Sequence, residues 1–267
     1  MKGAVPFSGT RQGKSHMNKR LAGKVALVTG GSRGLGAATA AALAEQGADV
    51  AISYVASAQK AAAVVAALEA KGVRALAIQS DQGDPAAAKA LIERVVAHFG
   101  RLDILVNNAA LAIQGKLIDD PEIDNAALDR QWQVNVMGVV ATIRAAAPVI
   151  SDEGRIISVG SGLGTRVGFP GTADYAASKA AVIGYTKGAA RDLGPRRITA
   201  NVVQPGIMAT DMAAGSAGSL PPIVMASHAI DRIATVEEVA AAIVFLAGPD
   251  AGYITGSVLD VNGGFTA

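Results

Sequence analysis

The stretch Lys24-Val-Ala-Leu-Val-Thr-Gly-Gly-Ser-Arg-Gly-Leu-Gly36 joins an apolar run to closely spaced glycines. The apolar run predicts a buried strand at 24–29, and the alanine-rich sequence after it predicts a helix at 34–46. Glycines at 30, 34 and 36 permit a tight turn and let the backbone approach a pyrophosphate closely. Because the helix would begin at this turn, its first N–H groups could bind that anion. The stretch therefore predicts a phosphate-binding loop, with an ordinary glycine-rich turn as the alternative.

Strand-like and helix-like segments alternate along the rest of the chain. The predicted strands lie at 24–29, 49–53, 75–79, 102–107, 155–159, 199–203 and 257–261. The predicted helices lie at 34–46, 57–71, 85–99, about 128–147, 175–193 and 236–247. Apolar strands joined by helical crossovers indicate a parallel sheet that is covered on both faces. The predicted fold is α/β: a single-domain, doubly wound Rossmann fold with a seven-stranded parallel sheet flanked by helices, over residues 21–267.

The segment 1–20 carries five basic side chains and no acidic one. It has no apolar core of the kind found in secretory signals, so we expect a flexible N-terminal tail or tag, with the natural start at Met17. Without Lys2, Arg11 and Lys14 the formal charge of the chain would fall from +2 to −1. The basic balance therefore gives no reason to expect a nucleic-acid partner.

Neither a membrane span nor a metal site is predicted. No apolar run reaches the roughly 18–20 residues that a spanning helix needs. The chain contains no cysteine, and its three histidines (His16, His98 and His228) lie far apart in the sequence, without metal-ligand spacing. The absence of cysteine is compatible with a reducing compartment, and we expect a cytoplasmic protein.

The end of the second predicted strand bears on the choice of nucleotide. That strand ends at Ser53, and no acidic residue occurs between Asp49 and Glu69. Proteins that bind NAD usually place an acid here, where it holds the ribose 2′-hydroxyl. Its absence admits a 2′-phosphate, and Arg33 in the glycine loop could supply the matching positive charge, unless it is simply a solvated loop residue. We therefore predict NADP(H) rather than NAD(H).

A tyrosine and a lysine lie four residues apart in Tyr175-Ala-Ala-Ser-Lys179. This spacing places both side chains on one face of a helix, where an ammonium would lower the tyrosine pKa and suit it to proton transfer. A surface helix pair is the alternative. Ser161 follows a predicted buried strand, where its hydroxyl could orient a substrate carbonyl group. Ser158 competes for that role but lies further back in the strand.

These motifs, in this order, resemble the short-chain dehydrogenase/reductase family. The likeness covers roughly residues 21–267 and starts with the pattern Thr-Gly-x-x-x-Gly-x-Gly at 29–36. It extends to the segment 260–264, which in the family is associated with subunit contacts. The resemblance implies a catalytic tetrad of Asn135, Ser161, Tyr175 and Lys179, in which the asparagine holds a water beside the lysine. Family members are commonly tetramers, so we expect a homotetramer.

The resemblance also extends the set of predicted cofactor contacts. An acid at the end of the third strand would meet the adenine ring, and residues after the sixth strand would hold the carboxamide and phosphates. The full set is Gly30, Ser32, Arg33, Gly34, Leu35, Gly36, Ser53, Tyr54, Ser57, Asp81, Gln82, Asn108, Ala109, Ala110, Tyr175, Lys179, Pro205, Gly206, Ile207 and Thr210. Two departures from the family pattern leave the shape of the substrate pocket undetermined by the resemblance. Ala110 replaces a glycine, and the Ser161-to-Tyr175 separation is one residue longer than usual.

The activity that this resemblance implies is reversible, NADPH-dependent reduction of a ketone to a secondary alcohol. The segment 209–231 is expected to form a lid over an apolar pocket with Leu163, Phe169 and Met208, so the substrate should be an uncharged small molecule. A 3-oxoacyl-carrier-protein reductase is the alternative, although the stretch 148–154 is acidic and only Arg196 and Arg197 remain as carrier contacts. An enoyl reductase is less favoured, because that branch spaces Tyr and Lys further apart. A non-catalytic NADP-binding regulator would be expected to lack a tetrad member.

Overall fold

The computed structural model describes residues 19–208 and 225–267. At its centre β1 (Val25–Val28) is buried along its whole length. Its side chains alternate between two apolar cores: Val25 and Leu27 belong to one, and Ala26 and Val28 belong to the other. This two-sided burial explains why the strand has an uninterrupted apolar sequence.

Seven parallel strands form one sheet in the order β3-β2-β1-β4-β5-β6-β7. The strand order reverses beside β1, which pairs with both β2 and β4, and ligands of such sheets bind at the carboxyl edge beside this switch point. The predicted fold class is therefore confirmed. The remaining strands are β2 (Asp49–Tyr54), β3 (Ala75–Gln79), β4 (Leu102–Asn107), β5 (Ile150–Val159), β6 (Thr199–Pro205) and β7 (Val258–Val261).

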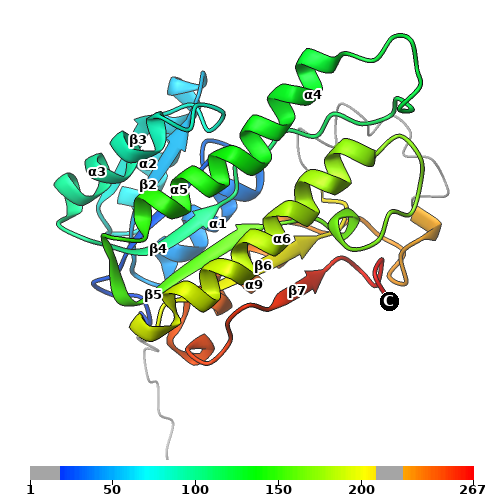
Figure 1. The fold of residues 1–267 in the computed structure, drawn as a ribbon. Helices are drawn as coiled ribbons and strands as arrows, with labels where there is room; N and C mark the ends of the chain where they lie inside the picture. The colour runs from blue at the N-terminus through cyan, green and yellow to red at the C-terminus, as the bar shows by residue number, and fades with distance from the viewer. Residues whose placement is uncertain (1–18, 209–224) are drawn as a thin grey trace, which may run out of the picture.

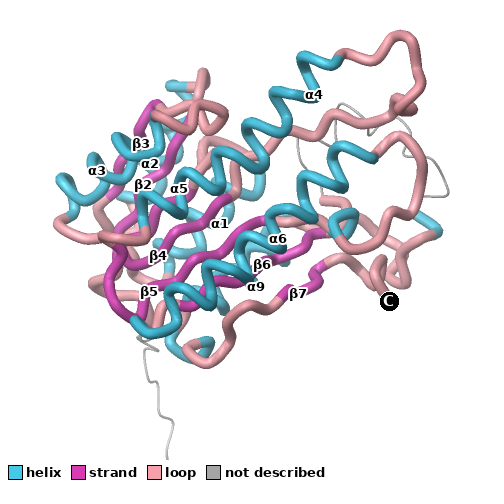
Figure 2. The backbone as a smooth tube through the Cα atoms, viewed as in Figure 1, coloured by secondary structure: helices cyan, strands magenta, loops and turns pink. Residues whose placement is uncertain are grey.

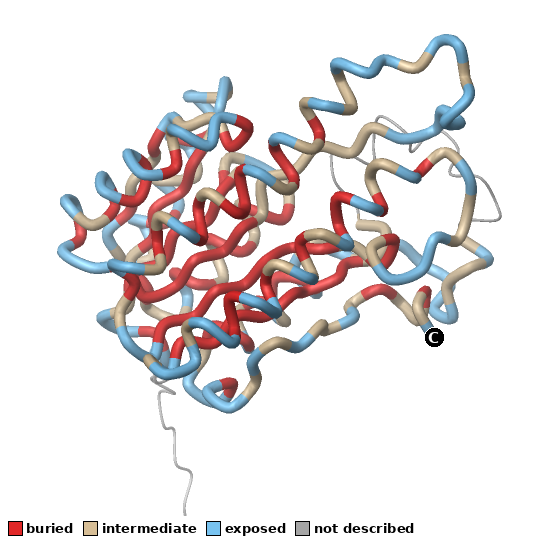
Figure 3. The backbone as a smooth tube through the Cα atoms, in the orientation of Figure 1, coloured by how far each residue is buried: buried red, intermediate tan, exposed pale blue. Residues whose placement is uncertain are grey.

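Helices cover both faces of the sheet (Figure 1). One core lies under α1 (Gly34–Glu45), α2 (Ala58–Glu69) and α9 (Val236–Ala247). The other lies under α3 (Ala87–Phe99), α5 (Gly138–Ala146) and α6 (Ala173–Leu193). Figure 3 shows the buried residues concentrated in the strands and on the inner sides of these helices. Short 3₁₀ turns occur at Gly162–Gly164, Gly194–Arg196 and Pro249–Ala251.

The helix predicted at about 128–147 is divided by a change in its hydrogen-bonding pattern. Figure 2 shows the course of its backbone. It begins earlier, as α4 (Asn125–Trp132), where the Asp124 side chain accepts a hydrogen bond from the N–H of Ala127. A π-helical turn follows at Gln133–Met137, and its wider spacing is seen in the bond from the Gly138 N–H to the Gln133 carbonyl. Turns of this kind occur often at functional sites. Here it contains Asn135.

Two further boundaries differ from the prediction. β5 begins at Ile150 rather than at 155, with an irregular register between Leu102 and Ile104 on β4 and a positive φ at Glu153. β6 continues to Pro205, which pairs with Val261 of β7. Charged residues at 152–153 conceal the first part of β5 from a pattern based on apolar runs. The predicted tail at 1–20 lies outside the described residues except for Lys19 and Arg20, and Arg20 forms an ion pair with Asp250.

Within the described part of the chain, no helix has the length and apolar character required to cross a membrane.

Candidate active site

The glycine loop after β1 is held against the end of β4. Thr29 Oγ1 accepts hydrogen bonds from the N–H groups of Asn108 and Ala109, at 3.0 and 3.1 Å. The Asn108 side-chain amide donates to the carbonyls of Thr29 and Gly30, at 2.9 and 3.2 Å. A Cβ on Gly36 would lie 2.3 Å from the Gly30 carbonyl oxygen. The glycine is therefore required for the close packing of loop and helix.

The first turn of α1 opens onto a cavity of about 450 Å³ at the carboxyl edge of the sheet. Gly34, Leu35 and Gly36 line this cavity. Arg33 occupies the N-cap position, and its side chain does not cap the helix. The N–H groups of this turn and the positive end of the helix dipole are thus directed toward the cavity, as an anion-binding turn requires.

The end of β2 forms the next part of the cavity wall. Ser53 is buried, and its hydroxyl accepts a hydrogen bond from the N–H of Gly30 at 3.2 Å. Its carbonyl also accepts from the N–H of Gly31, at 2.9 Å. Ser53 therefore positions the glycine loop, while Tyr54 and Ser57 line the cavity beyond it.

Asp81, at the far side of the same cavity, forms an ion pair with Arg130 of α4. Its Oδ1 also accepts a hydrogen bond from the Gly83 N–H, at 2.9 Å. Burial acts to raise the pKa of Asp81, but the Gly83 hydrogen bond and the Arg130 guanidinium together lower it. Asp81 is thus held as a carboxylate. Arg130 was not predicted, because sequence spacing gives no sign of a contact across 49 residues.

Tyr175 and Lys179 lie near the start of α6 and both line the cavity. Lys179 is almost fully buried, and its Nζ donates to the Val159 carbonyl oxygen at 2.9 Å. The same Nζ lies 5.7 Å from the centroid of the Tyr175 ring. Burial lowers the pKa of Lys179 to about 8. The spacing of four residues therefore places the two side chains together, as predicted from helix geometry.

The pKa of Tyr175 differs from the expectation. Burial raises it, and a hydrogen bond with Ser161 opposes that rise without overcoming it. The predicted lowering by Lys179 is therefore not what the structure shows, because desolvation of a phenolate outweighs the favourable contacts. A raised pKa keeps the phenol protonated at neutral pH, which is the state that a proton donor requires.

Asn135 lies in the π-helical turn and is buried. Its Oδ1 accepts from the Leu111 N–H at 2.8 Å, and its Nδ2 donates to the Leu111 carbonyl at 2.9 Å. Nδ2 also donates to Ser178 Oγ at 3.1 Å, and that hydroxyl donates to the Tyr175 carbonyl at 2.7 Å. Asn135 therefore joins the segment after β4 to the helix that carries Tyr175.

The cavity gathers most of the predicted cofactor residues. Leu111, Val134, Val159 and Gly160 line it as well and lie within two positions of predicted residues, so a wider window around each motif would have found them. Predicted cofactor residues on its wall are Gly30, Ser32, Arg33, Gly34, Leu35, Gly36, Ser53, Tyr54, Ser57, Asp81, Gln82, Asn108, Ala109, Ala110, Tyr175, Lys179 and Pro205. Met208, predicted for the substrate pocket, also lines it, and the unpredicted residues are Val55, Ala56, Ser80, Leu111, Arg130, Val134, Val159 and Gly160.

Two predicted cofactor residues line a different cavity, and a third is not described. Gly206 and Ile207 line a neighbouring cavity of about 550 Å³, which also includes His228 and Asn262. Thr210, and with it most of the predicted lid, lies outside the described residues. Two of the predicted catalytic residues do not line the cavity themselves. Ser161 is hydrogen-bonded to Tyr175 on its wall, and Asn135 is hydrogen-bonded to Leu111 on its wall.

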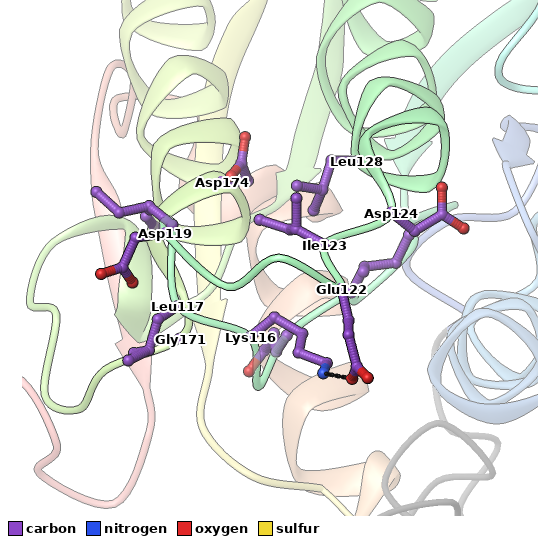
Figure 4. A pocket seen from close by; sticks show the side chains of 13 residues that line it. Lys116, Leu117, Asp119, Glu122, Ile123, Asp124, Leu128, Gly171 and Asp174 are labelled. Carbon is purple, nitrogen blue, oxygen red and sulfur yellow. Dashed lines mark hydrogen bonds and ion pairs between the residues drawn. The ribbon is translucent and has the colours of Figure 1, made fainter.

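A third cavity, of about 570 Å³, lies between the starts of α4 and α6 (Figure 4). Leu117, Ile123 and Leu128 contribute apolar wall, and Lys116 forms an ion pair with Glu122 at 2.7 Å. None of the predicted catalytic or cofactor residues lines this cavity. Among residues 19–208 and 225–267, no three His, Cys, Asp or Glu side chains form a cluster that could hold a metal ion.

Comparisons with known proteins agree with this architecture. A family model described as enoyl-(acyl carrier protein) reductase matches residues 30–266. The 3-oxoacyl-[acyl-carrier-protein] reductase FabG of Staphylococcus aureus strain Mu50 is 42% identical over 243 residues, covering 90% of this chain and 97% of the relative.

Two solved structures match at similar length. A blue fluorescent protein from a metagenomic library, in complex with NADPH, has 46% identity and a TM-score of 0.87, covering 93% of this chain and 100% of that one. A short-chain dehydrogenase from Burkholderia cenocepacia J2315, in complex with NADP, has 48% identity, a TM-score of 0.86 and the same coverage. The chain thus belongs to the short-chain dehydrogenase/reductase family and is an NAD(P)-dependent oxidoreductase that acts on CH–OH or C=O groups.

Proposed function

We propose that the protein reduces a ketone to a secondary alcohol, reversibly, with NADPH as the hydride source. The observation that carries this proposal is a phenol–ammonium pair on the wall of the cavity into which the glycine loop opens. Tyr175 and Lys179 lie on that wall, and Tyr175 is hydrogen-bonded to Ser161. A bound nicotinamide would supply the hydride, and Tyr175, assisted by Lys179 and Ser161, would donate the proton.

The described residues fit a dinucleotide phosphate. The α1 turn that lines the cavity has no side-chain cap, and Gly36 leaves no room for a Cβ beside Gly30. Asp81, the one carboxylate among the described residues of the wall, is paired with Arg130. The wall near Arg33, Tyr54 and Ser57 therefore carries no acid that would repel a 2′-phosphate. The two solved relatives in complex with NADPH and NADP support the same choice.

Each candidate catalytic residue has a role that its contacts allow. Tyr175 donates the proton to the substrate oxygen, and its raised pKa keeps that proton in place until reduction. Lys179 retains a positive charge below its pKa of about 8 and steadies the phenolate that forms. The Ser161 hydroxyl forms a hydrogen bond with the same substrate oxygen and orients it. Asn135 fixes Leu111 and, through Ser178, the backbone at Tyr175.

Cofactor preference tests the NADPH assignment. With any ketone that is turned over, we expect a clearly lower KM for NADPH than for NADH. Arg33→Ala should raise the KM for NADPH roughly 10- to 100-fold, because it removes a charge-assisted contact of about 1.5–3 kcal/mol, and should leave the KM for NADH nearly unchanged. Arg191→Ala, at an exposed position on α6, serves as the control. A wild-type preference for NADH would contradict the assignment.

Reduction of carrier-bound 3-oxoacyl groups is the second candidate function. It is favoured by the 42% identity to FabG over 90% of the chain. Against it, the basic side chains that could grip an acidic carrier are already engaged. Arg196 Nε donates to Asp152 Oδ1 at 2.7 Å, and Arg197 forms an ion pair with Glu153 at 3.0 Å.

A ketone panel separates these two candidates. NADPH absorbance would be followed with simple ketones, with acetoacetyl-coenzyme A and with acetoacetyl groups on an acyl carrier protein. The small-ketone assignment predicts similar kcat/KM for free and carrier-bound substrates. A large preference for the carrier-bound form would establish the second candidate instead. Enoyl reduction remains less favoured because Tyr175 and Lys179 keep the four-residue spacing, and a regulatory role is less favoured because all four tetrad residues are present.

The homotetramer and the cytoplasmic location remain predictions. Gel filtration at the mass of a monomer would contradict the former.

A further inference from the structure

Phe265, in the segment after β7, is inserted beneath the loop that follows β5. It is only 3% exposed. A Cβ on Gly162 would lie 2.8 Å from its Cδ1 atom, and a Cβ on Gly168 would lie 3.0 Å from both Cε2 and Cζ. These distances mean that the loop rests directly on the ring, with glycine at both points of contact.

The ring is held from several directions. Arg166 of the same loop donates to the Phe265 carbonyl oxygen, and its guanidinium carbon lies 5.3 Å from the ring centroid. The ring of His228 lies 5.4 Å away, centroid to centroid. Gly263 and Gly264 both have positive φ, which forms the turn that presents Phe265. The ring is therefore in contact with its surroundings on several sides.

The supported loop carries groups of the candidate active site. Ser161 directly precedes Gly162, and its hydroxyl is hydrogen-bonded to Tyr175. Leu163 and Ala176 form a small apolar cluster with Phe265, and Tyr175 itself packs against that cluster. A shift of the ring would thus move the Ser161 side and the Tyr175 side of the site relative to one another.

We propose that Phe265 is a positioning residue, which fixes the loop 162–168 so that the Ser161 and Tyr175 hydroxyls converge on one substrate oxygen. This role rests on the proposed function, since it concerns the geometry of the same two hydroxyls. Leu35 of the glycine loop belongs to a different apolar core from Phe265, so binding of the cofactor phosphates should not depend on it.

The first test compares Phe265→Leu with Phe99→Leu. Phe99 is 7% exposed and lies in α3, in a different apolar core, so it is a matched control for loss of a buried ring. We expect Phe265→Leu to lower kcat roughly 10-fold, because a displacement of about 1 Å can cost about 10²-fold and a smaller one correspondingly less, with an unchanged Kd for NADPH. Phe99→Leu should lower stability and leave kcat unchanged.

The pH profile supplies a readout that a purely structural role would not change. The hydrogen bond from Ser161 lowers the pKa of Tyr175. Moving Ser161 away would therefore raise that pKa. The decline of kcat/KM for ketone reduction near pH 8, which reports Lys179, should stay in place, whereas the further decline at higher pH, which reports Tyr175, should shift upward in Phe265→Leu only. The buried Lys179, the other charged group beside Tyr175, is unchanged in both variants.

A second pair of variants tests the contact itself, should Phe265→Leu fold poorly. Gly168→Ala places a methyl group against the ring and nothing else within 4 Å. Gly168→Ala alone should lower kcat. In the Phe265→Leu background, where the edge of the ring is absent, Gly168→Ala should lower kcat by a smaller factor than it does in the wild type. Additive effects in this double-mutant cycle, or equal losses of kcat in Phe265→Leu and Phe99→Leu, would overturn the positioning role. A wild-type protein without any NADPH-dependent ketone reduction would overturn the proposed function itself.

Discussion

Tyr175→Phe is expected to abolish ketone reduction while the protein still folds and binds NADPH. The change removes one hydroxyl, the only proton donor that the proposed function assigns to the substrate oxygen. Positioned general acids contribute roughly 10²- to 10⁴-fold in rate, so kcat should fall by at least that range. The hydrogen bond with Ser161 is lost as well, but the ring remains to pack against Leu163, Ala176 and Phe265.

Three measurements check this expectation. NADPH consumption with a saturating ketone reports kcat, a fluorescence titration reports the Kd for NADPH, and thermal unfolding reports the fold. Tyr185→Phe is the matched control, since Tyr185 lies on the same helix and contacts Arg144 rather than the cavity. Full activity of Tyr175→Phe would refute the assignment of the proton donor.

Lys179→Met is expected to inactivate the enzyme and, at the same time, to stabilise the cofactor-free protein near pH 7. The pKa of Lys179 falls from 10.5 to about 8 because burial disfavours the ammonium. A shift of this size corresponds to about 3 kcal/mol of lost stability when the group is charged. Losing the hydrogen bond to Val159 offsets about 1 kcal/mol of the gain, which leaves a net stabilisation of about 2 kcal/mol.

The pH dependence of this difference has a definite sign. Below about pH 8 the lysine is protonated in both the folded and the unfolded chain, so the full cost of burying the charge is present. Between about 8 and 10.5 the folded chain binds fewer protons, and wild-type stability rises with pH toward that of the variant. Urea unfolding near pH 7 and near pH 10 measures the full difference and most of its disappearance, with Lys187→Met as the exposed control on the same helix. A variant that is less stable than wild type at neutral pH would show that burial of the Lys179 ammonium does not destabilise the native protein.

The sequence was sufficient for the features that depend on local pattern. The apolar run before Gly30 predicted β1, and the spacing of Tyr175 and Lys179 predicted that their side chains share one face of a helix. Both follow from short-range pattern: a short continuous apolar run for the strand, and a spacing of nearly four residues for the helix. The parallel sheet followed from the same patterns, because apolar strands alternate with helices.

Features that depend on contacts between distant segments were not predicted. The ion pair of Asp81 with Arg130 joins a loop to a helix 49 residues away, and no local pattern marks it. The pKa of Tyr175 was expected to fall, because its sequence shows the neighbouring lysine but not the extent of burial. Phe265 follows a glycine pair in the sequence, and only the fold brings it to Gly162 and Gly168.

The π-helical turn at 133–137 constrains the number of residues around Asn135 as well as their identity. Such a turn contains one residue more than a regular helix would, and each helical residue rotates the chain by about 100°. Gly138 faces the Gln82 carbonyl oxygen so closely that a Cβ would lie 2.0 Å from it. Removing any one residue from the turn would rotate α5 against α4 and bring a side chain to that contact. Substitutions at 133–137 therefore alter one contact each, whereas a single deletion would misalign the whole helix on which the cavity wall depends.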